Sequence, residues 1–261
     1  MLQANSVAEP YIVFEDVVVS HNEIVILDGL SFSIEAGEFV CILGPSGCGK
    51  STTLRLMSGL LQPQSGSIVV DGRSPDAAYA DFAFVFQSPR LVAWRNAIRN
   101  VTLATELRNG STDRSANEKR ALELLSLVGL AQDGQKRANE LSGGEKQRVA
   151  IARALHVNPR TLLMDEPFSA LDVRTRESMR REIISLWKQQ RKTVVFVTHD
   201  IDEAIFLADR IIVLSCKPTI VEETIRVSTP RPRDMDHDVD VQVLRTRLYQ
   251  IMRADSATAN Q

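Results

Sequence analysis

Cysteines and long hydrophobic runs are both scarce in this chain. Three cysteines among 261 residues, Cys41, Cys48 and Cys216, are too few for a disulfide framework and lack the spacing of a metal site. A reducing compartment is therefore favoured. No apolar run approaches the roughly 18–20 residues that a membrane-spanning helix needs, and residues 1–10 lack the basic and apolar regions of a signal peptide. If the protein acts at a membrane, a partner must hold it there.

An excess of charge of either sign is also lacking. The formal net charge is −2, so we expect no nucleic-acid partner and no binding to an anionic membrane surface. Hydrophobic residues make up 44% and charged residues 25% of the chain, which is the balance of a globular protein with a buried core. The length suits one large domain, or a core that carries a subdomain.

Apolar runs that suit buried strands alternate with amphipathic helical patterns over most of the chain. This alternation predicts an α/β fold with a mainly parallel sheet. From about Leu91 to Asn158 the pattern is helical instead, which predicts a helical subdomain inserted into the core. The predicted strands are 11–19, 24–27, 30–34, 38–43, 67–70, 82–86, 161–164, 193–197 and 210–214, and the predicted helices outside the insertion are 50–58, 174–191, 201–208 and 241–252.

A glycine-rich stretch follows the apolar run 38–43 and opens a predicted helix. In this strand–loop–helix context it matches the full phosphate-loop pattern, whereas a simple turn before a buried helix would not need a Lys-Ser pair. Glycines let several backbone N–H groups face one anion, and the helix N-terminus adds partial positive charge. We expect Lys50 to reach the β- and γ-phosphates of a nucleotide, Ser51 to bind Mg²⁺, and Thr52 to lie beside the phosphates. The predicted nucleotide-binding residues of this loop are Gly44, Pro45, Ser46, Gly47, Cys48, Gly49, Lys50, Ser51 and Thr52.

Two adjacent acids end the apolar run 161–164. Carboxylates at the end of a buried strand are costly unless they serve a cation or a reaction, and open α/β sheets bind their ligands at this edge. We expect Asp165 to hold Mg²⁺, directly or through water. Glu166 is expected to polarise an attacking water as general base, a role worth roughly 10²–10⁴-fold in rate. A pair of helix-capping acids is the alternative, and the phosphate loop in the same chain counts against it.

A second glycine pair opens a helix predicted to run to about Val157. Ser142 and Glu145 have capping-box spacing, so a well-capped helix is one interpretation. Two consecutive glycines exceed what capping needs, and they leave backbone N–H groups bare for a phosphate. The stretch consists of Leu141, Ser142, Gly143, Gly144 and Glu145.

With these motifs together, the chain resembles the ATP-binding subunit of ABC transporters over about residues 12–225. The run 141–155 resembles that family's signature motif, although the family usually has Gln where this chain has Glu145. The resemblance implies an α/β fold with a phosphate-loop (RecA-like) core, a mixed sheet, an antiparallel β subdomain and an inserted α-helical subdomain. It also implies an ATPase domain over 11–225, with the core at 11–90 and 159–225, the helical subdomain at about 91–158, and a C-terminal extension at 226–261.

The family pattern assigns roles to further residues of this chain. Gln87 resembles the Q-loop residue that senses Mg²⁺ and the permease, and His199 resembles the switch histidine that contacts the γ-phosphate. The position of the family's adenine-stacking aromatic falls near His21, whose imidazole can stack but does so more weakly, so the resemblance makes His21 the expected adenine contact. The D-loop, which crosses the dimer interface in this family, corresponds to Ser169, Ala170, Leu171 and Asp172.

The resemblance implies hydrolysis of ATP, with Mg²⁺, by a homodimer or pseudo-dimer in which residues 141–145 of one subunit close over the ATP of the other. Leu91–Asn96 resembles the element that receives a permease coupling helix, although Trp94 could equally belong to the core. Phe196–Ala204 and the tail at Arg231–Arg233 are similar to importers of nitrate, sulfonate, taurine and bicarbonate.

These resemblances imply a peripheral subunit at the cytoplasmic face of the cell membrane, which powers uptake of a small anionic solute. Its partners would be an integral membrane permease and an extracytoplasmic solute-binding protein. A soluble ABC-type ATPase that is not coupled to transport is the alternative. The tail after residue 225 is either a solvated extension or a segment that packs on the core or on the second subunit.

Overall fold

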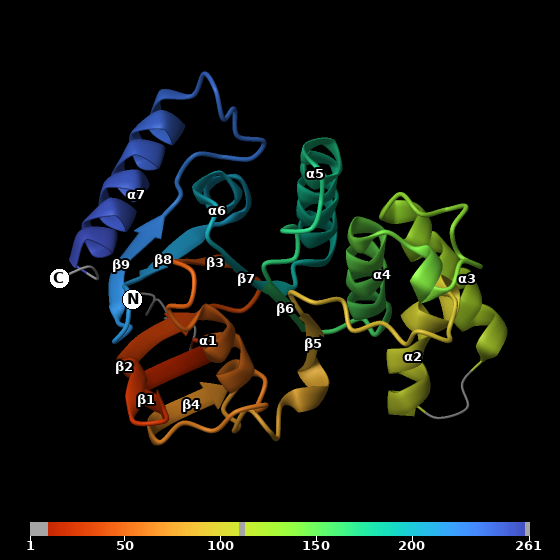
Figure 1. The fold of residues 1–261 in the computed structure, drawn as a ribbon, viewed down its shortest axis with the longest axis horizontal. Helices are drawn as coiled ribbons and strands as arrows, with labels where there is room; N and C mark the ends of the chain where they lie inside the picture. The colour runs from red at the N-terminus through yellow and green to blue at the C-terminus, as the bar shows by residue number, and fades with distance from the viewer. Residues whose placement is uncertain (1–9, 110–112, 259–261) are drawn as a thin grey trace, which may run out of the picture. The chain divides into compact units, whose positions relative to one another are not determined.

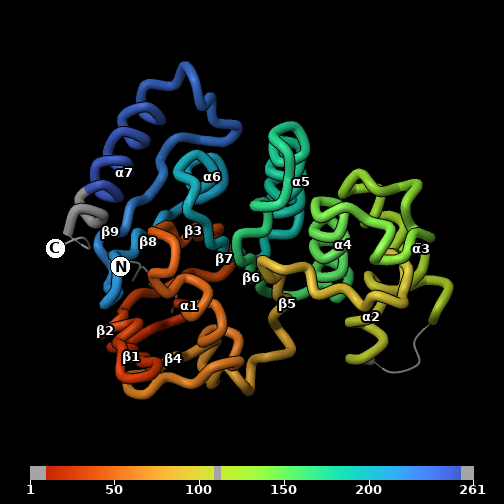
Figure 2. Tube along the Cα trace, viewed as in Figure 1, coloured from red at the N-terminus to blue at the C-terminus, as the bar shows by residue number. Residues whose placement is uncertain are grey.

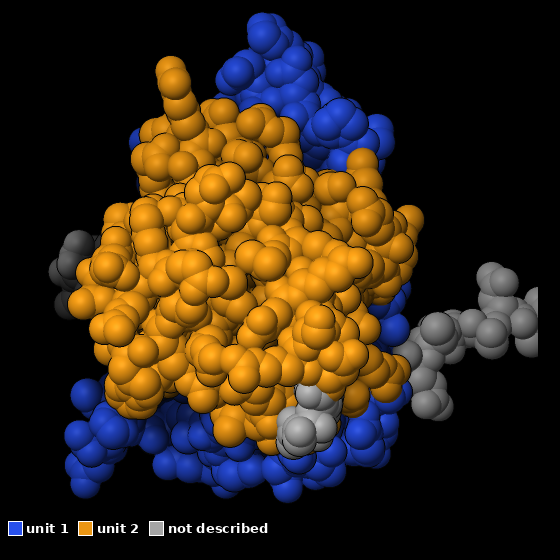
Figure 3. All heavy atoms as spheres, turned by 90° about the vertical axis from the view of Figure 1, so that its right-hand side faces the viewer, with its two compact units in different colours: residues 1–79, 199–261 blue, residues 80–198 orange. Residues whose placement is uncertain are grey.

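The chain divides into two compact units, which Figure 3 distinguishes by colour. The computed structural model describes residues 10–109 and 113–258, so residues 1–9, where no signal peptide is expected, lie outside this part. Unit 1 consists of Met1–Tyr79 and His199–Gln261, and unit 2 consists of Ala80–Thr198. Within the described ranges, no helix combines the length and the apolar character that crossing a membrane requires.

Unit 1 is built from strands of two sheets together with helices (Figures 1 and 2). In the first sheet, β1 lies between β2 and β4 and pairs antiparallel with both. In the second, β8 pairs parallel with β3 and antiparallel with β9. The expected antiparallel subdomain and mixed sheet are therefore confirmed. The elements are β1 (Ile12–His21), β2 (Ile24–Ile34), β3 (Phe39–Leu43), α1 (Lys50–Met57), β4 (Ser65–Val70), α6 (Ile201–Leu207), β8 (Arg210–Leu214), β9 (Val221–Arg226) and α7 (Val239–Thr258).

β2 is one continuous strand, whereas the sequence predicted two strands, 24–27 and 30–34, with a turn between them. The register of β1 against β2 shifts at several points, which is the mark of β-bulges. Gly29 adopts a φ of +67° within β2, and the Ser31 hydroxyl donates a hydrogen bond of 3.1 Å to Asp16 on β1. Strand pairing therefore resumes on both sides of Asp28 and Gly29, whose types are typical of a turn.

The C-terminal extension folds onto unit 1 rather than being solvated. In the extension, α7 runs beyond the predicted 241–252 at both ends. Val241 and Leu248 of α7 are fully buried, and α7 contacts α6. Figure 1 shows the chain after β9 passing beside α6 before it enters α7.

Unit 2 combines three parallel strands with the helical segment. β5, β6 and β7 pair in that order, and every residue of β6 and β7 is buried. α3 begins at Arg114, because Asp113 accepts hydrogen bonds from the backbone N–H groups of Ser115 and Ala116 and so caps the helix. The elements are η1 (Tyr79–Asp81) at the boundary with unit 1, then β5 (Phe82–Val85), α2 (Ala97–Asn109), α3 (Arg114–Leu127), η2 (Ala138–Glu140), α4 (Gly143–His156), β6 (Thr161–Asp165), α5 (Val173–Gln190) and β7 (Thr193–Thr198).

A buried histidine connects the three helices of the inserted segment. His156, at the end of α4, is 4% exposed. Its Nε2 lies 3.1 Å from the Asn117 carbonyl oxygen of α3, and its Nδ1 lies 2.7 Å from the Thr105 hydroxyl of α2. Because a carbonyl oxygen only accepts, the ring proton belongs on Nε2, and Nδ1 then accepts from Thr105. Burial lowers the pKa of His156, so the neutral ring fits this arrangement.

This network predicts that acid weakens the protein through His156. Below the unfolded-state pKa of about 6.5, the unfolded chain binds a proton that the folded chain resists, so stability is lost as pH falls toward the lowered folded pKa. The free energy of unfolding should fall between pH 7 and pH 5 with a contribution from this site of at most about 1.4 kcal/mol per pH unit. Urea unfolding of the wild type and of His156→Gln across this range measures the contribution as a difference.

His237 provides the matched control, because its side chain is 85% exposed. The same unfolding series on His237→Gln shows how much of the pH dependence comes from an exposed histidine. An acid loss that persists in full in His156→Gln would contradict the assignment.

Candidate functional site

The phosphate loop lies between β3, which is fully buried, and α1. Gly49 at the N-cap of α1 has a φ of 108°, and Gly47 has a φ of +79°. Lys50, the first helical residue, is 4% exposed, and its ammonium donates hydrogen bonds of 2.8 Å to the carbonyl oxygens of Gly44 and Pro45. The loop therefore wraps around the lysine at a helix N-terminus. This arrangement of amine and backbone N–H groups suits an anion such as a phosphate chain.

A residue outside the motif donates a hydrogen bond to the backbone of the phosphate loop. The fully buried Thr219 donates its hydroxyl hydrogen to the Cys48 carbonyl oxygen and its backbone N–H to Ile26 of β2. The Cys48 side chain is buried, and burial raises the pKa of its thiol, so the thiol stays protonated at neutral pH. The expectation that only the backbone of Cys48 serves the site is consistent with this environment. Thr219 carries no local sequence signal, and its role is visible only in the fold.

The remaining expected residues of unit 1 differ in exposure. Ser51 and Thr52 lie half-buried in the first turn of α1, next to the fully buried Thr53, whose hydroxyl donates to the Gly49 carbonyl oxygen at 3.1 Å. His21 is exposed at the end of β1, and its proposed adenine contact stays a prediction. His199 is exposed directly before Asp200, which caps α6.

Unit 2 brings two of the predicted catalytic residues together. Gln87 follows β5 and Glu166 follows β6, and because these strands are parallel neighbours, both residues lie at the same edge. The Gln87 amide donates to a Glu166 carboxylate oxygen at 3.3 Å. Asp165, which ends β6, is 5% exposed. A hydrogen-bonding amide and two acids thus converge where parallel strands end.

Glu166 has an unusual backbone for a residue other than glycine. Its φ is 43°, in the left-handed region, a conformation that costs on the order of 1–3 kcal/mol at such positions. The conformation is held by a hydrogen bond of 3.0 Å from the Glu166 N–H to the Val197 carbonyl oxygen. Ser169 adds two bonds, from its N–H and its hydroxyl, to the Glu166 carbonyl oxygen. Backbone strain of this kind gathers at active sites.

The helix α4 begins with the capping box that the sequence suggested. The Ser142 hydroxyl accepts from the Glu145 N–H at 3.2 Å, and the Glu145 carboxylate accepts from the Ser142 N–H at 2.6 Å. The bond from the Ser142 N–H lowers the pKa of Glu145. A Gln at this position could accept the same bond, so Glu145 preserves the local structure.

The glycine pair of α4 lies against the predicted D-loop. A Cβ atom on Gly144 would come within 3.3 Å of both the Ala170 carbonyl oxygen and a Leu171 methyl carbon, whereas one on Gly143 would meet nothing within 4 Å. Gly144 therefore allows close approach of the D-loop, and Gly143 leaves its backbone uncovered. Asp172 ends the D-loop by capping α5, where it accepts from the Thr175 N–H at 3.0 Å.

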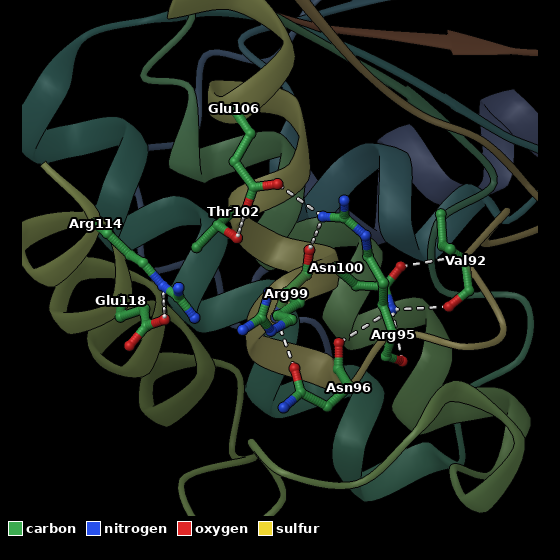
Figure 4. A network of polar contacts seen from close by, with 9 residues as sticks. All are labelled: Val92, Arg95, Asn96, Arg99, Asn100, Thr102, Glu106, Arg114 and Glu118. Carbon is green, nitrogen blue, oxygen red and sulfur yellow. Dashed lines mark hydrogen bonds and ion pairs between the residues drawn. The ribbon is translucent and has the colours of Figure 1, made fainter. Parts of the chain in front are cut away.

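The segment after Gln87 is shaped by a buried asparagine that sequence reasoning missed (Figure 4). Asn100 of α2 is fully buried, and its Oδ1 accepts from the Val92 N–H at 2.8 Å. Its amide nitrogen donates to the carbonyl oxygens of Val92, Arg95 and Asn96. Trp94 in this segment is 80% exposed, so the alternative that it belongs to the core is wrong.

The helix α4 also donates hydrogen bonds to the backbone on both sides of Gln87 in the sequence. Gln147, which is 1% exposed, donates to the Phe86 carbonyl oxygen at 3.1 Å. The Arg153 guanidinium donates to the carbonyl oxygens of Pro89 and Arg90 at 2.7 and 2.9 Å. Residues just before and just after Gln87 are thus bonded to the helix that Ser142 begins.

Comparison with known proteins gives a consistent set of relatives. The family model described as ABC transporter matches residues 27–169. The bicarbonate transport ATP-binding protein CmpD of Synechococcus elongatus is 42% identical over 212 residues, which cover 81% of this chain and 76% of that protein. The nitrate import ATP-binding protein NrtD of the same species is 40% identical over 232 residues, which cover 88% and 80%.

Solved structures of ATP-binding cassettes are also similar. A dimeric cassette in a post-hydrolysis state, bound to ADP and Pi, has a TM-score of 0.77 and 36% sequence identity over 84% of this chain and all of that chain. A second dimeric structure, of a bacterial ABC transporter cassette, gives the same values.

The geometry of the phosphate loop predicts unequal costs for its glycines. Gly47→Ala places a Cβ in open space, so it should lower the free energy of unfolding by about 1–2 kcal/mol through backbone strain alone. Gly49→Ala adds a contact of 2.9 Å with a Leu27 methyl carbon, and overpacking costs about 1–3 kcal/mol more. Denaturant unfolding without nucleotide measures both, and equal losses in the two variants would contradict the prediction.

Proposed function

The chain belongs to the ABC transporter family and is an ATP hydrolase of that family, and we propose that it powers import of a small anionic solute through a separate membrane permease. The observation that carries the hydrolytic mechanism is the contact between Gln87 and Glu166 beside Asp165, in a chain with a complete phosphate loop. Lys50 and the loop N–H groups would bind the phosphates, and Glu166 would take a proton from the attacking water. Gln87 is bonded to that base and would orient the same water.

The residues expected at a magnesium site fit the ion. Ser51 offers a hydroxyl oxygen, Gln87 an amide oxygen and Asp165 a carboxylate, and Mg²⁺ prefers such hard oxygen ligands in combination with nucleotide phosphates. When bound, the ion would neutralise charge that develops on the phosphates. The protein's own part is to bury Asp165 at the end of β6.

We further propose that two copies, or this chain and a homologous subunit, complete each other's sites. The support is the uncovered backbone at Gly143, the position of the D-loop against Gly144, and the dimeric state of the similar cassettes. In this arrangement residues 141–145 contact the γ-phosphate of the ATP bound by the partner, His199 contacts it from its own chain, and Ser169–Asp172 cross between the subunits. Loss of the γ-phosphate removes contacts from both sides, so hydrolysis opens the dimer.

The importer assignment follows from the relatives, whose names concern bicarbonate transport and nitrate import. It is supported by the exposed Trp94, on a segment held rigidly by Asn100, as a surface for the permease. The protein would then lie at the cytoplasmic face of the membrane, and an extracytoplasmic solute-binding protein would deliver the solute.

Glu166→Gln tests the hydrolytic mechanism. We expect ATP turnover to fall by about 10²–10⁴-fold, because the amide cannot accept the proton, while ATP still binds and induces a dimer. Phosphate release and light scattering with ATP and Mg²⁺ measure the two effects. Lys50→Ala is the contrasting variant and should lose nucleotide affinity as well as turnover. Full activity of Glu166→Gln would refute the assignment of the base.

Trp94→Ala separates the importer from a soluble ATPase. Aromatic anchors at interfaces commonly contribute 2 kcal/mol or more, so we expect at least about a tenfold loss of affinity for the permease. The measurement is recovery of a permease with the tagged full chain from native membranes. Tyr79→Ala, at an aromatic residue 66% exposed outside this segment, is the control and should retain recovery. A wild-type chain that recovers no membrane protein would favour the soluble ATPase.

A further inference from the structure

The short helix α6 ends in four carbonyl groups that the C-terminal extension satisfies. α6 has seven residues, and helices of this length are marginal without tertiary support. An α-helix leaves its last four carbonyls without intrahelical partners. Those of α6 accept hydrogen bonds from two arginines of the extension, Arg231 and Arg233. The acceptors are the carbonyl oxygens of Ile205 at 2.6 Å, Phe206 at 3.3 Å and Ala208 at 2.7 Å, all from Arg233, and that of Leu207 from Arg231.

Arg233 is buried and makes further hydrogen bonds within the extension. The residue is 6% exposed, and its guanidinium also donates to the carbonyl oxygens of Thr229 and Val227 at 2.8 and 3.3 Å. Burial lowers the pKa of Arg233 to about 10, so the group still carries its charge at neutral pH. A buried cation is favourable at a helix C-terminus, where the dipole and the free carbonyls are negative.

The extension also holds α6 and β3 at further points. The Arg231 guanidinium donates to Asp209 at 2.6 Å, and the other carboxylate oxygen of Asp209 accepts from the Phe39 N–H at the start of β3. Arg245 of α7 donates to Asp202 in the first turn of α6 at 2.7 Å. Side chains from beyond residue 230 therefore form hydrogen bonds with both ends of α6.

The position of α6 matters because of what precedes it. Asp200 caps the helix and accepts from the Glu203 N–H at 3.1 Å, and His199 is the next residue toward the N-terminus. His199 directly precedes the N-cap of α6, so a shift of the helix moves the His199 backbone with it. We propose that Arg233, with Arg231, is a positioning residue for the ATPase reaction: the extension clamps α6 and thereby places His199. The proposal rests on the role of His199 given above and assigns a function to the extension.

Arg233→Ala tests the clamp in the full chain. We expect the kcat for ATP to fall by about 10- to 100-fold, since small displacements of a reacting group have effects of this size. The Kd for ATP should change less than about twofold, because the phosphate loop is not altered. Amide hydrogen exchange over residues 201–208 should become faster. Arg247→Ala is the matched control within the extension: Arg247 bonds Glu223 of β9 and leaves α6 untouched, so its kcat should equal that of the wild type.

A double-mutant cycle distinguishes positioning from general weakening. In a His199→Ala background, Arg233→Ala should cause little further loss of single-turnover rate, because both changes act through one group. Losses that multiply, or a wild-type kcat in Arg233→Ala, overturn the proposal. If Arg233→Ala does not fold, Arg233→Lys is judged by the same criteria, since an ammonium keeps the charge but cannot reach the same set of carbonyls.

The two proposals can fail separately. If Glu166→Gln retains full turnover, the hydrolytic assignment fails. If Glu166→Gln loses turnover while Arg233→Ala keeps it, only the clamp is refuted.

Discussion

The unpaired backbone groups at helix ends are the constraint on which this structure depends. A helix leaves four N–H groups free at its start and four C=O groups free at its end. Four of the segments assigned to function adjoin such ends: the phosphate loop precedes α1, the signature precedes α4, the D-loop precedes α5, and His199 precedes α6. The hydrogen-bond partners of these backbone groups differ from one helix end to the next. A helix end whose groups are bonded to the protein's own side chains is structural, whereas one that lacks such side chains can bind a ligand.

The start of α1 differs from the starts of α4, α5 and α6. α4, α5 and α6 begin at Ser142, Asp172 and Asp200, whose side chains accept from the backbone. α1 begins at Gly49, which has no side chain that could accept from the backbone, and helix N-termini of this kind suit a phosphate. The start of α4 has features of both kinds. The Ser142 hydroxyl accepts from the backbone N–H of Glu145, while nothing covers the backbone at Gly143.

The sequence predicted those parts of the fold and of the site that require particular types of side chain. The buried run of β3, the Lys-Ser pair at 50–51 and the acids after β6 need particular side chains, and the α/β order follows from their alternation. β9 was not predicted, because Ile225 is its one buried residue and pairing with β8 creates the strand. The division of β2 was wrong for a related reason: the bulge that admits Gly29 is set by the partner strand. The contact of Gln87 with Glu166 required the neighbouring positions of β5 and β6, which no local pattern encodes.

The contacts of four residues that hold segments near the site escaped prediction for a further physical reason. Asn100, Arg153, Thr219 and Arg233 all donate to backbone carbonyl oxygens, and a carbonyl oxygen is the same whatever residue carries it. The acceptor of such a contact then has no residue type that marks it in the sequence, and the donor type alone does not say where its partner lies. The geometry nevertheless restricts substitution, because one planar guanidinium must meet several oxygens at fixed angles. A lysine at position 233 would keep the positive charge, but its ammonium could not donate to the same set of carbonyl oxygens at the end of α6.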